Sequence, residues 1–195
     1  MNKLSQTIEI EFKNLLTIDE FTKLKSYFNV KEEDFFSQEN HYFDTKDFIL
    51  KEYKMALRVR EKNNQLELTL KQPLATGLLE TNEVITNEQF EQLKRGNFPI
   101  GQISQILSSY IPQLNKIEFF GTLKTFRHEL PFKNGLLVLD KSIYLGIEDY
   151  ELEYEVSDEK EGAIHFQTLI NELGITQKHT HNKVLRFYLR KKELA

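Results

Sequence analysis

The chain has 195 residues, a net charge of −4 and 29% charged residues, proportions typical of a globular domain. The acidic balance argues against a nucleic acid polymer as partner, and the absence of cysteine excludes disulfides, thiolate zinc sites and cysteine nucleophiles. Residues 1–6 lack the apolar region of a signal peptide, and no apolar run is long enough to span a membrane. We therefore expect a cytoplasmic protein without a membrane partner.

The N-terminal quarter predicts a strand, a helix and a second extended segment. Residues 5–13 alternate between charged and apolar side chains, as a strand with one buried face does. Residues 17–20 fit a capping box, and apolar residues at helical spacing then predict a helix over about 18–28. Residues 34–44 are rich in aromatic side chains and predicted to be extended, with a short helical turn at 46–51.

The middle of the chain predicts a hairpin followed by one more strand. Residues 55–61 and 66–72 both alternate, and the polar residues 62–65 between them fit a turn. Residues 78–85 are predicted to form the next strand. Two helices are expected after it, over 87–95 and 103–110, broken by the segment 96–101.

The C-terminal half returns to strands before it ends in helical patterns. Three strands are predicted, over 116–130, 135–144 and 148–156. A helix over 159–173 ends at Gly174, and the basic segment 182–192 fits either a helix or a strand. About eight extended segments with mostly short connections favour antiparallel pairing, in a closed barrel or in two apposed sheets.

Three of the predicted strands carry charged side chains on one face. The acidic strands contain Glu9-x-Glu11-x-Lys13 and Glu151-x-Glu153, and a middle strand contains Arg58-x-Arg60. Such alternation usually marks the solvent-exposed face of an antiparallel sheet. Here, however, the charges are sorted by sign between strands, and Arg suits bidentate phosphate contacts. If the strands line one cavity, it would hold a divalent metal ion together with a polyanion.

The same motifs, in chain order, resemble the CYTH superfamily of triphosphate tunnel metalloenzymes. The resemblance spans the whole chain and rests on the following segments: Glu9-x-Glu11-x-Lys13, His41-Tyr42-Phe43-Asp44-Thr45, Leu57-Arg58-Val59-Arg60, Leu68-Thr69-Leu70-Lys71, Glu151-Leu152-Glu153 and Asn182-Lys183-Val184. The last segment departs from the Ser-Lys-Tyr of the family. The resemblance implies an α+β, mainly antiparallel fold in which residues 1–195 form a single domain: an eight-stranded, closed, tunnel-like barrel with a charged interior and helices packed outside.

The resemblance also implies roles for individual residues. Mg²⁺ or Mn²⁺ would be the cofactor, and the implied metal ligands are Glu9, Glu11, Asp140, Glu151 and Glu153. The implied phosphate-binding residues are Lys13, Arg58, Arg60, Lys71, Arg127, Lys183 and Arg186. Lys13 and Lys183 are also the implied catalytic residues, because either of them, or water on the metal ion, would assist deprotonation.

Three functions are compatible with these residues. The first is metal-dependent hydrolysis of a small-molecule triphosphate, either inorganic tripolyphosphate or an organic triphosphate. The second is a class IV-type adenylyl cyclase that converts ATP to cyclic AMP, although no segment establishes an adenine pocket. The third is a non-enzymatic polyphosphate-binding module, against which the two acidic pairs argue. The sequence leaves the oligomeric state open.

Other polar residues have simpler interpretations. Asp44 is expected to be a turn or helix cap rather than a metal ligand. The five histidines show no zinc-ligand spacing, and His179 and His181 are expected at the surface.

Overall fold

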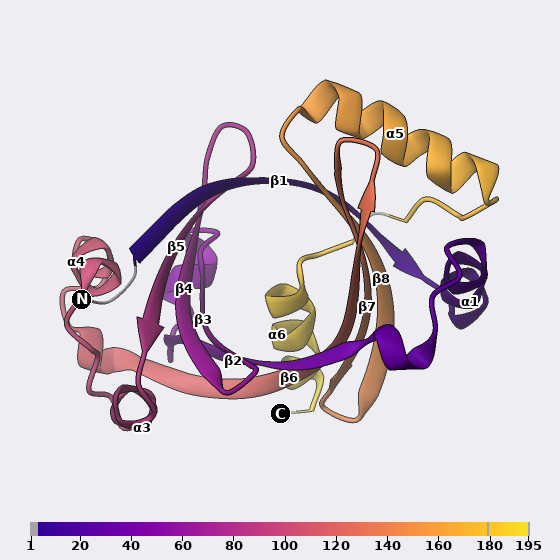
Figure 1. The fold of residues 1–195 in the computed structure, drawn as a ribbon. Helices are drawn as coiled ribbons and strands as arrows, with labels where there is room; N and C mark the ends of the chain where they lie inside the picture. The colour runs from indigo at the N-terminus through magenta and orange to yellow at the C-terminus, as the bar shows by residue number, and fades with distance from the viewer. Residues whose placement is uncertain (1–3, 179, 195) are drawn as a thin grey trace. The chain divides into compact units, whose positions relative to one another are not determined.

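The computed structural model describes residues 4–178 and 180–194 (Figure 1). Its strands are β1 (Leu4–Leu16), β2 (Phe36–Thr45), β3 (Ala56–Lys62), β4 (Gln65–Pro73), β5 (Leu78–Ile85), β6 (Ile117–Phe132), β7 (Gly135–Tyr144) and β8 (Ile147–Val156). Its α-helices are α1 (Ile18–Tyr27), α2 (Ile49–Glu52), α3 (Asn87–Lys94), α4 (Gln102–Ser108), α5 (Glu159–Glu172) and α6 (Lys183–Glu193). Short 3₁₀ turns occupy Glu32–Asp34 and Leu114–Lys116.

The strands close into an antiparallel barrel in the order β1-β5-β4-β3-β2-β6-β7-β8. This confirms the predicted fold class and the predicted strands, whose bounds differ from the sequence-based ranges by a few residues at most. The segment 182–192, which fitted a helix or a strand, forms helix α6. Within the described residues, none of the helices combines the length and the apolar character that crossing a membrane would require.

The described residues fall into two compact units, which we treat separately. The first comprises the described residues up to Ile8 together with Gln38–Leu123, and the second comprises Glu9–Ser37 together with the described residues from Lys124 onwards. The prediction that residues 1–195 form a single domain stays a prediction.

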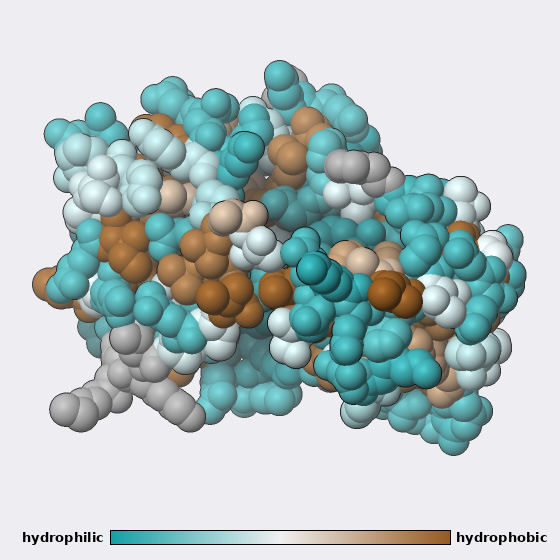
Figure 2. Space-filling model, turned by 90° about the horizontal axis from the view of Figure 1, so that it is seen from above, coloured by the Kyte–Doolittle hydropathy of each residue, from teal (hydrophilic) through white to brown (hydrophobic). Residues whose placement is uncertain are grey.

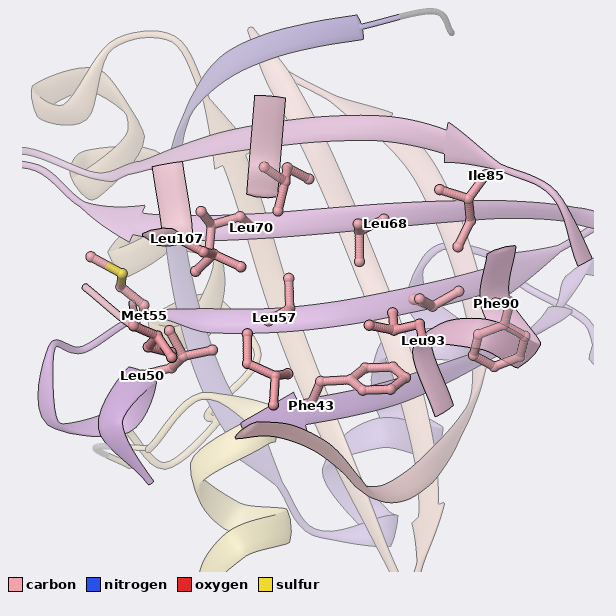
Figure 3. Close-up of a cluster of buried hydrophobic side chains, with 14 of the residues drawn as sticks. Phe43, Leu50, Met55, Leu57, Leu68, Leu70, Ile85, Phe90, Leu93 and Leu107 are labelled. Carbon is pink, nitrogen blue, oxygen red and sulfur yellow. The ribbon is translucent and has the colours of Figure 1, made fainter. Parts of the chain in front are cut away.

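In the first unit, β2 to β5 pair in sequence order and share one apolar face. Tight connections between β3, β4 and β5 set their registers, which run Arg58↔Thr69 and Lys71↔Glu80. Figure 3 shows the apolar side chains of these strands gathered in one cluster that includes residues of α2, α3 and α4. Because strand side chains alternate, Arg58 and Arg60 of β3, Lys71 of β4 and Glu80 of β5 lie on the opposite face.

In the second unit, β1, β8, β7 and β6 pair with one another in that order. Their apolar face packs against α1 and α5 in a cluster that includes Phe21, Leu152 and Phe166. Figure 1 shows α1 and α6 on opposite sides of β7 and β8. Helix α6 therefore lies on the side of these strands that carries their charged residues.

Side-chain caps fix where the helices begin. Thr17 and Glu20 form the predicted capping box of α1, with the Thr17 N–H donating to Glu20 Oε2 at 2.7 Å and the Glu20 N–H donating to Thr17 Oγ1 at 3.2 Å. Asp44 accepts N–H bonds from Leu50 and Lys51 and so caps α2, as expected for a structural rather than a metal-binding role.

The segment that follows α5 is tied to β1 and α1. The Lys178 N–H donates to Asn14 Oδ1 at 2.6 Å, and Asn14 Nδ2 donates to the Thr176 carbonyl at 3.0 Å. Glu20 accepts from the Thr176 N–H at 2.9 Å and from the Lys178 ammonium. Although partial burial opposes the charge, the N–H donors of Thr17 and Thr176 and the Lys178 ammonium lower the pKa of Glu20 to about 2. These bonds hold the chain in place shortly before α6.

Hydrophilic residues cover most of the molecular face in Figure 2, and hydrophobic residues lie between them in smaller patches. Scattered apolar residues of this kind are ordinary on a protein surface.

Candidate functional site

Three buried carboxylates from β7 and β8 form the centre of the second unit's charged face. Asp140 pairs in register with Glu151, and Glu153 lies two residues further along β8 on the same face. Asp140 and Glu151 are fully buried, Glu153 is 6% exposed, and one oxygen of each lies within 4.8 Å of the others. We refer to Asp140, Glu151 and Glu153 as the acidic cluster. Such a concentration of buried negative charge requires cationic partners.

Lys183 and Arg127 supply much of that positive charge. The Lys183 ammonium contacts Asp140 Oδ2 at 2.9 Å and forms ion pairs with Glu151 and Glu153. Arg127 donates to Asp140 Oδ1 through Nε at 2.8 Å and to Glu153 Oε2 through Nη2 at 2.9 Å. Burial alone would lower the pKa of Lys183, but the acidic cluster raises it well above its usual range. Burial opposes the charge of Glu153 too, but Lys183 and Arg127 hold its pKa well below the usual range.

The sequence places Lys183 at the cluster through a helix cap. Asn182 Oδ1 accepts the N–H of Leu185 at 2.9 Å, so α6 begins at Lys183. Asn and Ser are both strong N-caps, so the departure from the Ser-Lys-Tyr segment preserves this start. A cationic side chain in the first helical turn is disfavoured by the helix dipole, whereas nearby carboxylates are favoured there. The acidic cluster therefore compensates for the position of Lys183.

Arg186, one turn later in α6, binds the same strand. Its Nε donates to Asp149 Oδ2 at 3.0 Å, and its Nη1 and Nη2 each lie 3.1 Å from a Glu151 oxygen. Burial would lower the pKa of Arg186, but Glu151 and Asp149 raise it above its usual range. Asp149 is not among the site residues predicted from the sequence. Its position two residues before Glu151, on the same face, was the available signal.

β1 adds a second charged row beside β8. Lys13 lies opposite Glu153 in register and forms an ion pair with Glu11. Burial would lower the pKa of Lys13, yet Glu11, Glu153 and Glu151 raise it. Next along β8, burial raises the pKa of Glu155 to about 7. Arg127 opposes this shift, while the negative charges of Glu9, Glu153 and Glu11 add to it.

The first unit carries its own charged face. Lys71 Nζ lies 2.6 Å from Glu80 Oε1, and Arg58 Nη2 lies 3.8 Å from the same oxygen. Arg60 Nε donates to Asn40 Oδ1 at 3.2 Å. Burial would raise the pKa of Glu80, but Lys71 and Arg58 lower it to about 2. Glu80 is also not among the predicted residues, although the register of the β4–β5 hairpin places it directly opposite Lys71.

The structure thus distributes the sequence-predicted residues over two groups. The second unit holds Glu9, Glu11, Lys13, Arg127, Asp140, Glu151, Glu153, Lys183 and Arg186, and the first unit holds Arg58, Arg60 and Lys71. Among the described residues of the second unit, the carboxylates whose oxygens lie close to one another are those of the acidic cluster. Glu9 and Glu11 belong to β1, the strand next to β8. His181 is exposed as expected, and His179 lies outside the described residues.

The chemistry of the acidic cluster fits a hard divalent cation. Mg²⁺ and Mn²⁺ prefer carboxylate oxygens, and three of them converge here from two adjacent strands. This fit defines the acidic cluster as a candidate metal site.

Fold and charged face together define a class of protein: a closed antiparallel barrel whose strands place buried carboxylates and cationic side chains on a common face. The chain belongs to the CYTH domain family, whose family model matches residues 7–188. It is 44% identical over 190 residues to a protein of Bacillus subtilis (strain 168) named "Putative triphosphatase YjbK", covering 97% of this chain and 99% of that protein.

Solved structures show the same architecture. The crystal structure of a protein from Bacillus halodurans, described as a "putative adenylate cyclase", superposes with a TM-score of 0.89 at 41% identity, covering 94% of this chain and 98% of that one. HpAC1 from Hippeastrum superposes with a TM-score of 0.76 at 22% identity, covering 93% of this chain and 95% of that one. The second likeness supports the fold alone.

Proposed function

We propose that the protein hydrolyses a small-molecule triphosphate, inorganic tripolyphosphate or an organic triphosphate, with Mg²⁺ or Mn²⁺ as cofactor. The observation that carries this proposal is the acidic cluster, because three converging carboxylates within a set of cationic side chains suit a cation and a phosphate chain together. The name of the Bacillus subtilis relative, "Putative triphosphatase YjbK", supports the same reaction class.

In the proposed reaction, Asp140, Glu151 and Glu153 hold the metal ion, and Glu9 and Glu11 extend this acidic set along β1. When bound, the ion neutralises phosphate charge and acts as a Lewis acid on a phosphoryl oxygen. Lys13, Arg127, Lys183 and Arg186 exchange some of their carboxylate partners for phosphate oxygens. Arg58, Arg60 and Lys71 of the first unit are proposed phosphate-binding residues as well.

Water attacks the terminal phosphorus, and the bond from that phosphorus to the bridging oxygen breaks, which yields phosphate and the shortened chain. The hydroxyl of the water stays on the phosphate, and its other proton passes to the departing oxygen or to solvent. The surrounding carboxylates raise the pKa values of Lys13 and Lys183. We assign both residues to the stabilisation of negative charge on the transferred group.

The test is turnover of tripolyphosphate, ATP and thiamine triphosphate with each metal ion, measured as released phosphate and as cyclic AMP. Glu153→Gln should lower metal-dependent phosphate release by at least about 100-fold, the scale of a lost charge-stabilising group. Glu148→Gln is the matched control, because Glu148 belongs to the same strand but is exposed and paired with Lys141. Equal activity in both variants would remove the acidic cluster from the reaction.

A cyclase is the second candidate, favoured by the description of the 41% identical Bacillus halodurans protein as a "putative adenylate cyclase". In that reaction the ribose 3′ hydroxyl of ATP attacks the α-phosphorus and pyrophosphate leaves. Cyclic AMP formed from ATP and Mn²⁺ without phosphate release would select this reaction over hydrolysis. Tight triphosphate binding without any turnover would instead select the binding module.

A further inference from the structure

A second group of potential metal ligands lies in the first unit, on the face of β2 and β3 opposite Arg58 and Arg60. Glu39 of β2 and Glu61 of β3 are directly paired in register, and His41 lies two residues from Glu39 on the same face. One ligand atom from each of the three residues lies within 4.8 Å of the others. This face otherwise carries the apolar cluster to which Phe43 and Val59 belong.

His41 is buried, with 9% of its surface exposed, and only one of its ring nitrogens has a hydrogen-bond partner. Nδ1 lies 2.8 Å from Thr122 Oγ1. Nε2 is buried without a partner and points to the two carboxylates, 4.0 Å from Glu39 Oε2 and 3.9 Å from Glu61 Oε2. Both separations exceed hydrogen-bond length, so the carboxylates do not satisfy this nitrogen directly.

The surroundings favour a neutral imidazole. The ring of Phe90 lies 4.9 Å from the His41 ring, centroid to centroid. Burial lowers the pKa of His41 with a further contribution from Lys94, and Glu39 and Glu61 only partly oppose this. If Nδ1 donates to Thr122, the Nε2 lone pair faces two negative charges. Such an arrangement is unfavourable until a cation lies between the three groups.

We propose that Glu39, His41 and Glu61 form a binding site for one divalent cation of the zinc class. One imidazole nitrogen and two carboxylates are a common ligand set for Zn²⁺, which binds both at about 2.0–2.2 Å. Tetrahedral geometry at that length separates neighbouring ligand atoms by about 3.3–3.5 Å. The observed separations of 3.9 and 4.0 Å are therefore reached by small side-chain rotations of the two glutamates.

The site has further features of a metal centre. Ligating histidines usually bond their other ring nitrogen to an oxygen, and Thr122 provides one here. The side chains of Glu39 and Glu61 are 44% and 49% exposed, which gives an ion access from solvent. Because the ligands come from two paired strands, the ion would link β2 to β3. Its function would be distinct from the proposed hydrolysis, since Arg58 and Arg60 lie on the other face.

The experiment measures Zn²⁺ binding to the full chain by calorimetry with a competing chelator, and Co²⁺ binding by visible absorption, which reports nitrogen and oxygen ligands at a four-coordinate ion. Both are carried out on the wild-type chain in a background of excess Mg²⁺, which occupies all-carboxylate sites such as the acidic cluster but competes poorly for an imidazole ligand. We expect one equivalent of bound ion in this background. His41→Gln and the double change Glu39→Gln/Glu61→Gln should each weaken binding by at least about 10–100-fold.

Two further variants test the outer shell of the site and the specificity of the glutamate effect. Thr122→Val keeps the side-chain shape but removes the hydroxyl, and should weaken binding about 10–100-fold, as loss of an outer-shell partner does. Glu52→Gln, an exposed carboxylate of the same unit, should leave it unchanged. Because Glu39 and Glu61 are half-exposed, their double variant is expected to fold even if His41→Gln does not.

Unchanged affinity and an unchanged Co²⁺ spectrum in the Glu39→Gln/Glu61→Gln variant would overturn the proposal. So would the absence of bound Zn²⁺ from the wild-type chain in the Mg²⁺ background. A protonated His41 that pairs with the glutamates would then explain the cluster. Neither result bears on the proposed hydrolysis, which depends on Glu153 and is assayed separately.

Discussion

Replacement of Lys183 by Met tests whether the acidic cluster is a cation site. The ammonium contacts three buried carboxylates, and its side chain is 12% exposed. Loss of one partner from a buried ionic network costs about 3–5 kcal/mol, because the remaining charges stay buried without compensation. Met has a similar length and no charge, so Lys183→Met should lower the free energy of unfolding in EDTA by about this amount.

A divalent cation should restore part of this loss. An ion present at 100 times its dissociation constant stabilises a folded protein by about 2.7 kcal/mol. In the wild type the ion competes with the Lys183 ammonium, so the stabilisation by Mg²⁺ or Mn²⁺ should be larger in the variant. The pH dependence has a defined sign as well. Lys183 keeps the pKa of Glu153 low, which adds stability above pH about 4.5 that is lost as the pH falls. The difference between the two proteins should therefore shrink in acid.

The assay is urea unfolding followed by far-ultraviolet circular dichroism, since the chain has no Trp. Lys141→Met is the matched control, because Lys141 lies on β7 but pairs near the surface with Glu148 and should change stability by less than about 1 kcal/mol. Two results would refute the reasoning: a Lys183→Met protein as stable as the wild type in EDTA, or equal stabilisation of both proteins by the cation.

Three further changes probe other parts of the structure. Glu155→Gln should stabilise the protein at pH 8 by about 1–2 kcal/mol after allowance for solvent screening, and have little effect at pH 4. Because the pKa of Glu155 is raised to about 7 in the folded protein, its ionisation lowers the free energy of unfolding as the pH rises from about 4.5 through 7. A difference in urea unfolding that does not depend on pH would contradict this. Gly162→Ala should destabilise by about 1–2 kcal/mol despite the better helix propensity of Ala, because the added Cβ would lie 2.7 Å from Val156 Cγ2. A gain in melting temperature would show that α5 can shift. Arg58→Gln should lower kcat/KM for the triphosphate about 10–100-fold if the guanidinium binds phosphate, and an unchanged value would exclude Arg58 from the substrate site.

Sequence patterns predicted the helices and strands well, because helix caps and side-chain alternation depend on residues close together in the sequence. The Thr17–Glu20 capping box fixes the start of α1 without help from the rest of the chain. Alternation predicted β8, since one face of the strand packs in the apolar cluster and the other carries acids. The segment 182–192 was ambiguous because basic and apolar residues alternate irregularly along it. The Asn182 cap, which depends on backbone geometry, makes it a helix.

The contacts within the site depended on information that sequence patterns lack. Which carboxylates converge is set by the β7–β8 register that places Asp140 opposite Glu151, and a one-residue slip would turn one of them away. Glu80 was missed for the same reason, since its partner Lys71 is defined by the hairpin register. Resemblance to the family supplied the residue types, while the pairing partners came only from the structure.

The bonds of Thr176 and Lys178 to Asn14 and Glu20 have a consequence for measured affinities. Four residues lie between Lys178 and Lys183, so the five Cα–Cα steps that join them span about 18 Å at most. Even if α6 left the strands, its first residue would remain near them, and its effective concentration at the acidic cluster would stay high. Lys183 therefore acts as an internal competitor that dilution of the protein does not weaken. Any apparent dissociation constant for a cation at the cluster includes the free energy needed to displace it.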